Sequence, residues 1–170
     1  MRKINFLNGF WTVMAAVLLA FSTISCDGIG GKGKNWSKEV VHEFPNTNWA
    51  FEEEVLDFPF DIEDTSLRYD ITVTLRYDTT VAVLKDIPLS LTLSAPDGMK
   101  SFATSQFLLD KANNPNIKMV DTYTAELPVV VYPHRKLKTA GTHTLTVYRR
   151  AEKADNYGFL SLTTKVTVAK

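Results

Sequence analysis

The stretch Leu-Arg-Tyr-Asp-Ile-Thr-Val-Thr-Leu-Arg-Tyr, residues 67–77, alternates apolar and polar side chains without a break over eleven positions. Successive side chains of a β-strand point to opposite faces of the sheet, so this period of two is typical of a strand. One face of the strand would carry Leu, Tyr, Ile and Val into a core, and the other would carry Arg, Asp and Thr into water. That pattern favours an antiparallel sheet with one face exposed to solvent.

Other segments share the alternation or the strand-like composition, and turn residues such as Pro96-Asp97-Gly98 separate them. We expect strands at 55–60, 89–95, about 123–132, 142–147 and 160–168. Together with 67–77 and the connections between them, these segments predict an all-β protein, an antiparallel β-sandwich of about seven or eight strands.

Three places in this pattern are less regular. Pro128 lies inside an expected strand, which indicates a sheet edge or a bulge because proline cannot donate to a ladder. Residues 101–109 fit either a strand or a short helix. Apart from 102–112, only residues 37–43 have helical potential. Residues 111–118 contain Asn-Asn-Pro-Asn and are expected to form a loop.

The N-terminal stretch predicts export and lipidation. Met1-Arg2-Lys3 is cationic, an apolar run extends from Phe10 to Phe21, and small residues lead to Cys26, the single cysteine of the chain. The apolar run is shorter than the roughly 20 residues that span a bilayer. We expect a lipoprotein signal peptide over 1–25, a lipidated Cys26 with a glycine-rich flexible tether over 26–36, and the sandwich over 37–170. A plain secretory signal is the alternative.

Lipidation would fix the location of the mature protein. Stable anchoring requires at least two acyl chains, and a diacylglyceryl cysteine supplies them. The expected location is therefore the cell envelope, with the membrane reached through Cys26 and the choice of membrane and leaflet left open. Without residues 1–25 the chain keeps about 17 basic and 19 acidic residues, so no basic field favours nucleic acid.

Catalytic patterns are weak in this sequence. The three histidines lack metal-ligand spacing, and His143 is expected to be a core residue because it lies on the apolar face of a strand. Acidic residues gather between Glu52 and Asp64, where paired carboxylates could hydrolyse glycosides or bind calcium. The simpler interpretation is the wet face of an edge strand and its turn. We expect no enzymatic activity and no cofactor.

Aromatic residues are dense after the tether. Six lie within a short stretch, namely Trp36, Phe44, Trp49, Phe51, Phe58 and Phe60. They could stack on sugar rings if they were exposed. Core packing is the favoured interpretation, since aromatic side chains at this density dominate the cores of small domains.

Three motifs carry a family resemblance: His-Glu-Phe-Pro-Asn-x-x-Trp at 42–49, Phe-Pro-Phe-Asp-Ile-x-Asp-Thr at 58–65, and Tyr-Asp-Ile-x-Val-x-Leu-Arg at 69–76. Over about 42–110 the chain resembles the GldH-type gliding-motility lipoproteins of Bacteroidetes. The resemblance implies an envelope lipoprotein linked to motility or type IX secretion machinery, with no cofactor and no catalysis.

The expected function is therefore binding of other envelope proteins by a lipid-anchored β-sandwich. The expected partner contacts are Trp49, Asp61 and Asp64, with the 111–118 loop as a second region. A surface glycan-binding or adhesin-like module is the alternative, and it would require exposed aromatic residues side by side.

Overall fold

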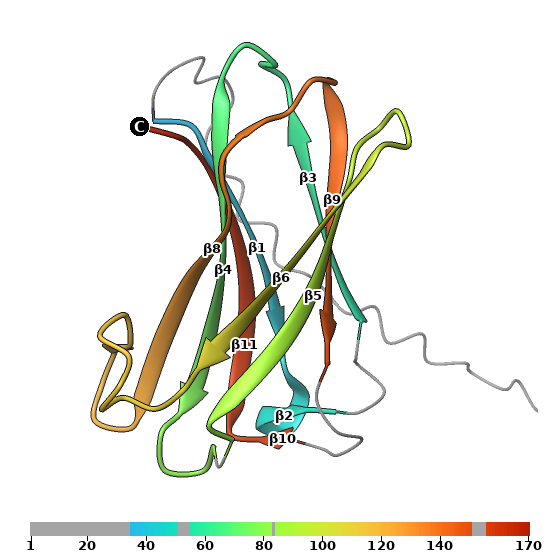
Figure 1. The fold of residues 1–170 in the computed structure, drawn as a ribbon. Helices are drawn as coiled ribbons and strands as arrows, with labels where there is room; N and C mark the ends of the chain where they lie inside the picture. Colours follow the sequence, from blue (N-terminus) through green and yellow to red (C-terminus); the bar gives the residue numbers. More distant parts are fainter. Residues whose placement is uncertain (1–34, 51–54, 83, 151–155) are drawn as a thin grey trace, which may run out of the picture.

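The computed structural model describes residues 35–50, 55–82, 84–150 and 156–170, and these residues form two antiparallel sheets packed face to face (Figure 1). The five-stranded sheet has the order β1-β11-β4-β8-β7, and the four-stranded sheet has the order β3-β9-β5-β6. The strands are β1 (Ser37–Glu43), β3 (Val55–Ile62), β4 (Arg68–Asp78), β5 (Asp86–Ser94), β6 (Lys100–Leu108), β7 (Lys118–Met119), β8 (Thr124–Lys136), β9 (Gly141–Arg149) and β11 (Phe159–Val168). The predicted β-sandwich is confirmed.

A small third pairing lies at one end of the sandwich. β2 (Asn48–Trp49) pairs with β10 (Asn156–Tyr157), and the 3-10 turn η1 (Pro45–Thr47) leads into β2. Gly158 follows β10 with a φ of +89°, and an added Cβ there would lie 2.6 Å from the Ala82 backbone nitrogen. Glycine is required at this position because both the backbone angle and the space exclude a side chain.

The strand that alternates most regularly in the sequence lies inside the five-stranded sheet. β4 pairs with β11 on one side and with β8 on the other, so both of its backbone edges are used. Its inward residues are all buried, namely Tyr69, Ile71, Val73, Leu75 and Tyr77. The outward residues Arg68 and Arg76 are exposed. The alternation therefore predicted both faces of the strand.

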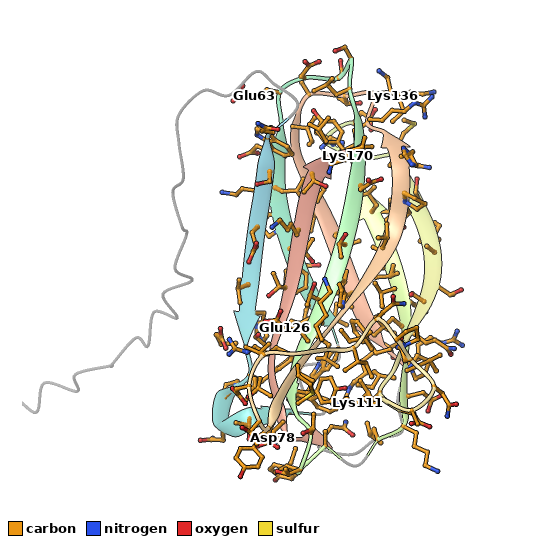
Figure 2. The ribbon with its side chains drawn as sticks, turned by 90° about the vertical axis from the view of Figure 1, so that its left-hand side faces the viewer. Glu63, Asp78, Lys111, Glu126, Lys136 and Lys170 are labelled. Carbon is orange, nitrogen blue, oxygen red and sulfur yellow. The ribbon has the colours of Figure 1, made fainter. Side chains whose placement is uncertain are left out.

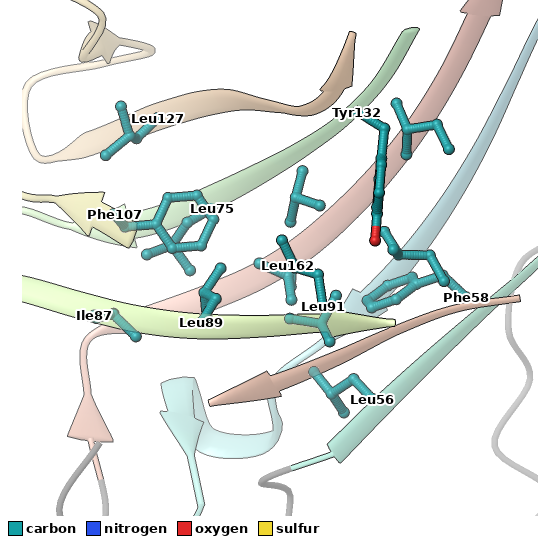
Figure 3. Packing of buried hydrophobic residues seen from close by; sticks show 14 of the residues in the cluster. Leu56, Phe58, Leu75, Ile87, Leu89, Leu91, Phe107, Leu127, Tyr132 and Leu162 are labelled. Carbon is teal, nitrogen blue, oxygen red and sulfur yellow. The ribbon is translucent and has the colours of Figure 1, made fainter. Parts of the chain in front are cut away.

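The core fills the space between the two sheets (Figure 3). Phe58, Leu89 and Leu91 approach from the four-stranded sheet, while Leu75 and Leu162 approach from the five-stranded sheet. Each such side chain contributes roughly 1.5–3 kcal/mol through burial. The fold is therefore stabilised mainly by side chains that alternate along the strands.

The helical potential of residues 37–43 is not realised, because these residues form the strand β1. All seven residues of β1 pair with β11, from Ser37 opposite Thr167 to Glu43 opposite Ser161. The pairing satisfies one backbone edge of β1, and Val40 packs against the core. A segment of this length gains more from a sheet edge than from two isolated helical turns. Residues 101–109 are also a strand, β6, paired along its whole length with β5.

Pro128 lies where the sequence indicated, near a sheet edge. It pairs with Thr74 of β4 on one side, and the two residues of β7 pair with Glu126 and Ala125 and so end before it. The ladder with β4 becomes irregular further along, and His134 there adopts a φ of 47°. The Asp70 carboxylate accepts a hydrogen bond from the His134 backbone N–H at 2.7 Å, which holds this bend in place.

Candidate partner-contact surfaces

Trp49 lies inside the fold, so its predicted role as a partner contact is corrected to a core role. Its side chain is 0% exposed. The indole ring stacks on Phe44 at 4.9 Å between centroids and meets Phe159 edge-on at 6.3 Å. These contacts attach the segment after β1 to the start of β11. The favoured interpretation of core packing for Trp49, Phe44, Phe58 and Phe60 is confirmed.

A buried arginine accompanies this tryptophan, and sequence reasoning missed it. Arg149, at the end of β9, is 2% exposed and places its guanidinium carbon 5.4 Å from the centre of the Trp49 ring. It also donates a hydrogen bond to the Ala50 carbonyl oxygen at 3.3 Å. A guanidinium over an indole face is a favourable cation–π arrangement, especially when water is excluded. The period of two in 142–147, continued by two residues, was the signal that could have placed Arg149 inward.

Asp61 lies at the surface of β3, beside a groove between the two sheets. Residues 38–42 of β1 line one side of this groove, and residues 57–61 of β3 line the other. The volume of the groove is about 410 Å³. The Asp61 carboxylate accepts a hydrogen bond from the Thr142 hydroxyl at 2.6 Å. Asp61 is therefore an accessible acid at the border of a cleft, and its contact with a partner stays a prediction.

Asp64 organises the turn between β3 and β4. Its carboxylate accepts hydrogen bonds from the Ser66 backbone N–H at 2.8 Å and from the Ser66 hydroxyl at 2.5 Å. Its carbonyl oxygen accepts a hydrogen bond from the Tyr69 hydroxyl at 2.6 Å. Burial raises the pKa of Tyr69, and the nearby Asp64 charge raises it further. Asp64 thus has a structural task in this turn, and a partner contact there stays a prediction as well.

The structure separates these predicted residues instead of gathering them. Asp64 lies beside Tyr69, whose ring meets Trp36 at 5.5 Å near the end of β11. Trp49 contacts Phe159 at the start of β11. The ten residues of β11 span about 30 Å, so the two regions lie at opposite ends of the sandwich. Figure 2 shows the same division, with Glu63 and Lys170 at one end and Lys111 at the other.

Hydrogen bonds of its own asparagine side chains fix the conformation of the 111–118 loop. The Asn113 amide donates to the Asp110 carboxylate at 2.6 Å, and the Asn114 amide donates to the Leu108 carbonyl oxygen at 2.8 Å. The Asn116 backbone N–H donates in turn to the Asn114 side chain at 3.0 Å. The bond between Asn116 and Asn114 is an Asx turn, and the three bonds together give the loop a defined shape next to the end of β6.

The acidic cluster has the predicted position, on an edge strand and its turn. Thr146 donates its hydroxyl hydrogen bond to Asp57 at 2.7 Å, as Thr142 does to Asp61. Asp57 and Asp61 are four residues apart on one strand, hence about 13 Å apart at their Cα atoms. Glycosidase carboxyl pairs lie within about 5–9.5 Å of each other, and the Cα separation of these two acids is larger than that. Glu52, Glu53 and Glu54 lie outside the described residues.

His143 is a core residue, as the sequence predicted. It is buried, its ring stacks on Phe60 at 5.9 Å, and its Nδ1 lies 3.2 Å from the Gly141 carbonyl oxygen. In the described ranges, no three histidine, cysteine or acidic side chains are grouped as a metal site would require. Among these same residues, no helix has the length and apolar character to cross a bilayer. Cys26 and the signal-like stretch lie outside the described residues.

Two exposed aromatic residues lie on the outer face of the four-stranded sheet. Phe102 of β6 is 76% exposed and Tyr148 of β9 is 40% exposed. Tyr148 pairs with Ser90 of β5, and Phe102 pairs with Thr92 of the same strand, so both rings share the outer face. Trp36 is half-buried against Tyr69.

No protein-family model matches this chain, and no curated protein matches it. A crystal structure of dimeric latent PorU from Porphyromonas gingivalis is similar over 81% of this chain, with a TM-score of 0.33 and 13% sequence identity. The match covers 14% of the PorU chain. A similarity of this size says nothing about activity or partners.

Proposed function

We propose that this protein is a lipid-anchored, non-catalytic component of the cell envelope that binds other envelope proteins. The observation that carries the proposal is the N-terminal pattern, in which a cationic start and an apolar run lead to the single cysteine, Cys26. A diacylglyceryl group on this cysteine would hold the sandwich at a membrane surface. Anchoring raises the effective concentration of the domain for membrane partners, so modest interfaces suffice.

The finer role, as a GldH-type accessory protein of motility or type IX secretion machinery, is supported by the three motifs that carry the resemblance. In the structure these motifs form the end of β1 with η1 and β2, then β3 with its turn, then β4. The motifs thus coincide with structural units that follow one another along the chain, with β3 in one sheet and β4 in the other. The partner itself is proposed by resemblance alone.

The anchor is tested by Cys26→Ala in the full chain, with Ser25→Ala as the matched control that keeps a small residue beside the cysteine. Wild type and Ser25→Ala should sediment with membranes and incorporate an alkyne fatty acid, because the cysteine sulfur remains available for diacylation. Cys26→Ala should lose the label and leave the membrane fraction. Absence of label from wild type would contradict the proposal.

Partner binding is tested by cross-linked purification of the tagged full chain from its native envelope, read by mass spectrometry. Recovery of motility or secretion proteins, lost in Cys26→Ala, would support the GldH-type role. The second candidate, glycan binding, is favoured by Phe102 and Tyr148 on one outer face, since aromatic faces stack on sugars. Recovery of polysaccharide without a protein partner would favour that candidate.

A further inference from the structure

Among the described residues, the two sheets leave strand edges without a neighbour, and most of these edges carry features that oppose pairing with another chain. β3 has Pro59 at its centre between Asp57 and Asp61. β8 contains Pro128 and Pro133 and is covered at one end by β7. Proline and charge are the common means by which proteins protect such edges.

The free edge of β1 is protected by charge. Four of its seven residues are ionisable, namely Lys38, Glu39, His42 and Glu43. Charged side chains along an edge oppose the approach of a further strand because pairing would remove water from them. β1 therefore resembles β3 and β8 in its protection, although it uses a different means.

β6 is the exception. It reads Lys-Ser-Phe-Ala-Thr-Ser-Gln-Phe-Leu, with no proline and with Lys100 as its single charge. Within the described residues it pairs only with β5 and is the last strand of its sheet (Figure 1). Phe102, at 76% exposure, is the most exposed of the large apolar residues described. A long edge with one terminal charge, no proline and an exposed aromatic residue is suited to pairing with another strand.

The hydrogen bonds at both ends of the β5–β6 ladder show which backbone groups are open. The Ala95 N–H donates to the Met99 carbonyl oxygen at 2.8 Å, and the Leu109 N–H donates to the Lys85 carbonyl oxygen at 2.8 Å. Antiparallel ladders alternate, so the odd-numbered residues of β6 bond to β5. The N–H and C=O groups of the even-numbered residues 100, 102, 104, 106 and 108 therefore point toward the free edge.

One of these groups is already satisfied. The Leu108 carbonyl oxygen accepts the Asn114 side-chain amide at 2.8 Å, which agrees with the alternation and closes the edge at that residue. The open set is thus Lys100, Phe102, Thr104 and Gln106. This set is symmetric about Ala103.

We propose that β6 pairs antiparallel with β6 of a second copy of this chain, with the twofold axis at Ala103. In this register Phe102 lies opposite Thr104 of the second copy, and Lys100 lies opposite Gln106 of the second copy. The open N–H and C=O groups of Lys100, Phe102, Thr104 and Gln106 are then paired, and the capped Leu108 carbonyl lies outside the paired segment. The two four-stranded sheets become one continuous eight-stranded sheet across the axis.

Side chains favour the same arrangement. The two Phe102 rings lie diagonally across the axis, and diagonal neighbours in a sheet are about 7–8 Å apart, within reach of aromatic rings. The single charge of β6, Lys100, faces an amide oxygen rather than a like charge. Because one strand pair buries less than the roughly 1,600 Å² of a standard interface, the dimer is expected to depend on protein concentration.

The register is tested by cysteine cross-linking in the full chain, purified from the fraction in which it accumulates. Two residues directly opposite in a non-hydrogen-bonded pair have Cα atoms about 4.5 Å apart, within disulfide range. Ala103→Cys should therefore form a disulfide dimer under mild oxidation. Ser105→Cys is the matched control, because it has the same inward orientation and partial burial on the same strand.

In the proposed register the two copies of residue 105 are separated by four residues along the strands, more than 10 Å by the strand rise, so they cannot be bridged. Ala103→Cys is expected to give at least about tenfold more dimer than Ser105→Cys. The wild-type chain, whose single cysteine is Cys26, measures the background of disulfide dimer that forms through that residue. Equal cross-linking of the two variants, or none in either, would overturn the proposal.

A second variant addresses the open backbone itself. Thr104→Pro removes an N–H that faces the free edge and does not take part in the β5 ladder, so the fold should persist while the dimer is lost. Thr104→Val keeps the N–H and is the control. Sedimentation should show a concentration-dependent dimer for wild type and Thr104→Val and a monomer for Thr104→Pro. Wild type that stays monomeric at every concentration would refute the pairing, whatever the outcome for the lipid anchor.

Discussion

The two edge strands of the four-stranded sheet, β3 and β6, are nearly equal in length and differ in both of their faces. β3 buries every inward residue, Leu56, Phe58, Phe60 and Ile62. β6 buries Phe107 alone, while its other inward residues, Ser101, Ala103 and Ser105, are small and half-buried. β3 is thus held by its side chains and has a proline at its edge, whereas β6 is held mainly by its ladder with β5 and has an open edge.

This difference shows that two functions of a strand are encoded separately. The inward face decides how firmly a strand belongs to the core, because it sets how much apolar surface is buried. The edge decides whether the strand accepts another neighbour, because backbone groups and charges lie there. In this protein the well-anchored edge strand is the protected one.

The largest expected effect compares one phenylalanine from each strand. Phe58→Ala should destabilise the protein by about 3–5 kcal/mol, because it leaves a cavity in the core. Phe102→Ala should change the stability of the monomer by less than about 0.5 kcal/mol, because its ring is exposed. Denaturant unfolding at low protein concentration measures both values. Similar losses for the two variants would contradict the contrast between the strands.

A smaller effect tests the alternation along β6. Ser105→Pro removes an N–H that bonds to β5 and leaves its acceptor without a partner, which should cost about 1–3 kcal/mol. Thr104→Pro removes an N–H at the free edge and should cost clearly less. The difference between their free energies of unfolding, measured under monomeric conditions, reports the side toward which each amide points. Equal destabilisation would mean that the assignment of open and bonded residues is wrong.

The smallest effect concerns the turn that leads into β6. A hydrogen bond from the Thr139 hydroxyl at 2.7 Å, together with one from the Met99 N–H at 3.0 Å, lowers the pKa of Asp97. Because the folded-state pKa is the lower one, its stabilisation is complete above the ordinary carboxyl value and is lost as pH falls through the lowered value. The melting temperature of Asp97→Asn should therefore lie below that of wild type at pH 7.

The difference in melting temperature between wild type and Asp97→Asn should shrink as the pH falls below about 4. Protonation then neutralises Asp97 in the wild type, so that it resembles the uncharged asparagine of the variant. Thermal unfolding followed by circular dichroism between neutral and acidic pH measures this difference. A gap that stays constant with pH would assign the effect of Asp97→Asn to turn geometry rather than to titration.

The alternation of apolar and polar residues along the strands predicted most of the fold. It identified the inward residues of β4, β5 and β9 together with Leu162 and Val166 of β11, and it placed His143 in the core. The predicted edge position of the acidic residues was also correct, because Pro59 and the carboxylates are compatible only with a strand that has one open side. The fold class follows from these local patterns.

The candidate site was predicted less well, and particular residues show why. Trp49 was placed among the partner contacts because it lies close in sequence to Asp61 and Asp64. Its burial depends on Phe159 and Arg149, which are about a hundred residues away along the chain. β1 was ambiguous for a related reason, since only its pairing with β11 at the other end of the chain makes it a strand.

The sequence by itself determined which side of β4, β5 and β9 is buried, because side-chain alternation and the hydrophobic effect act locally along the chain. It also determined the predicted export signal and the single cysteine on which the proposed anchor rests. The tertiary structure alone decided that β1 and β6 became edge strands, which backbone groups of β6 stayed open and that Trp49 was covered. Those properties depend on pairings between distant segments, and no local pattern of residues encodes them.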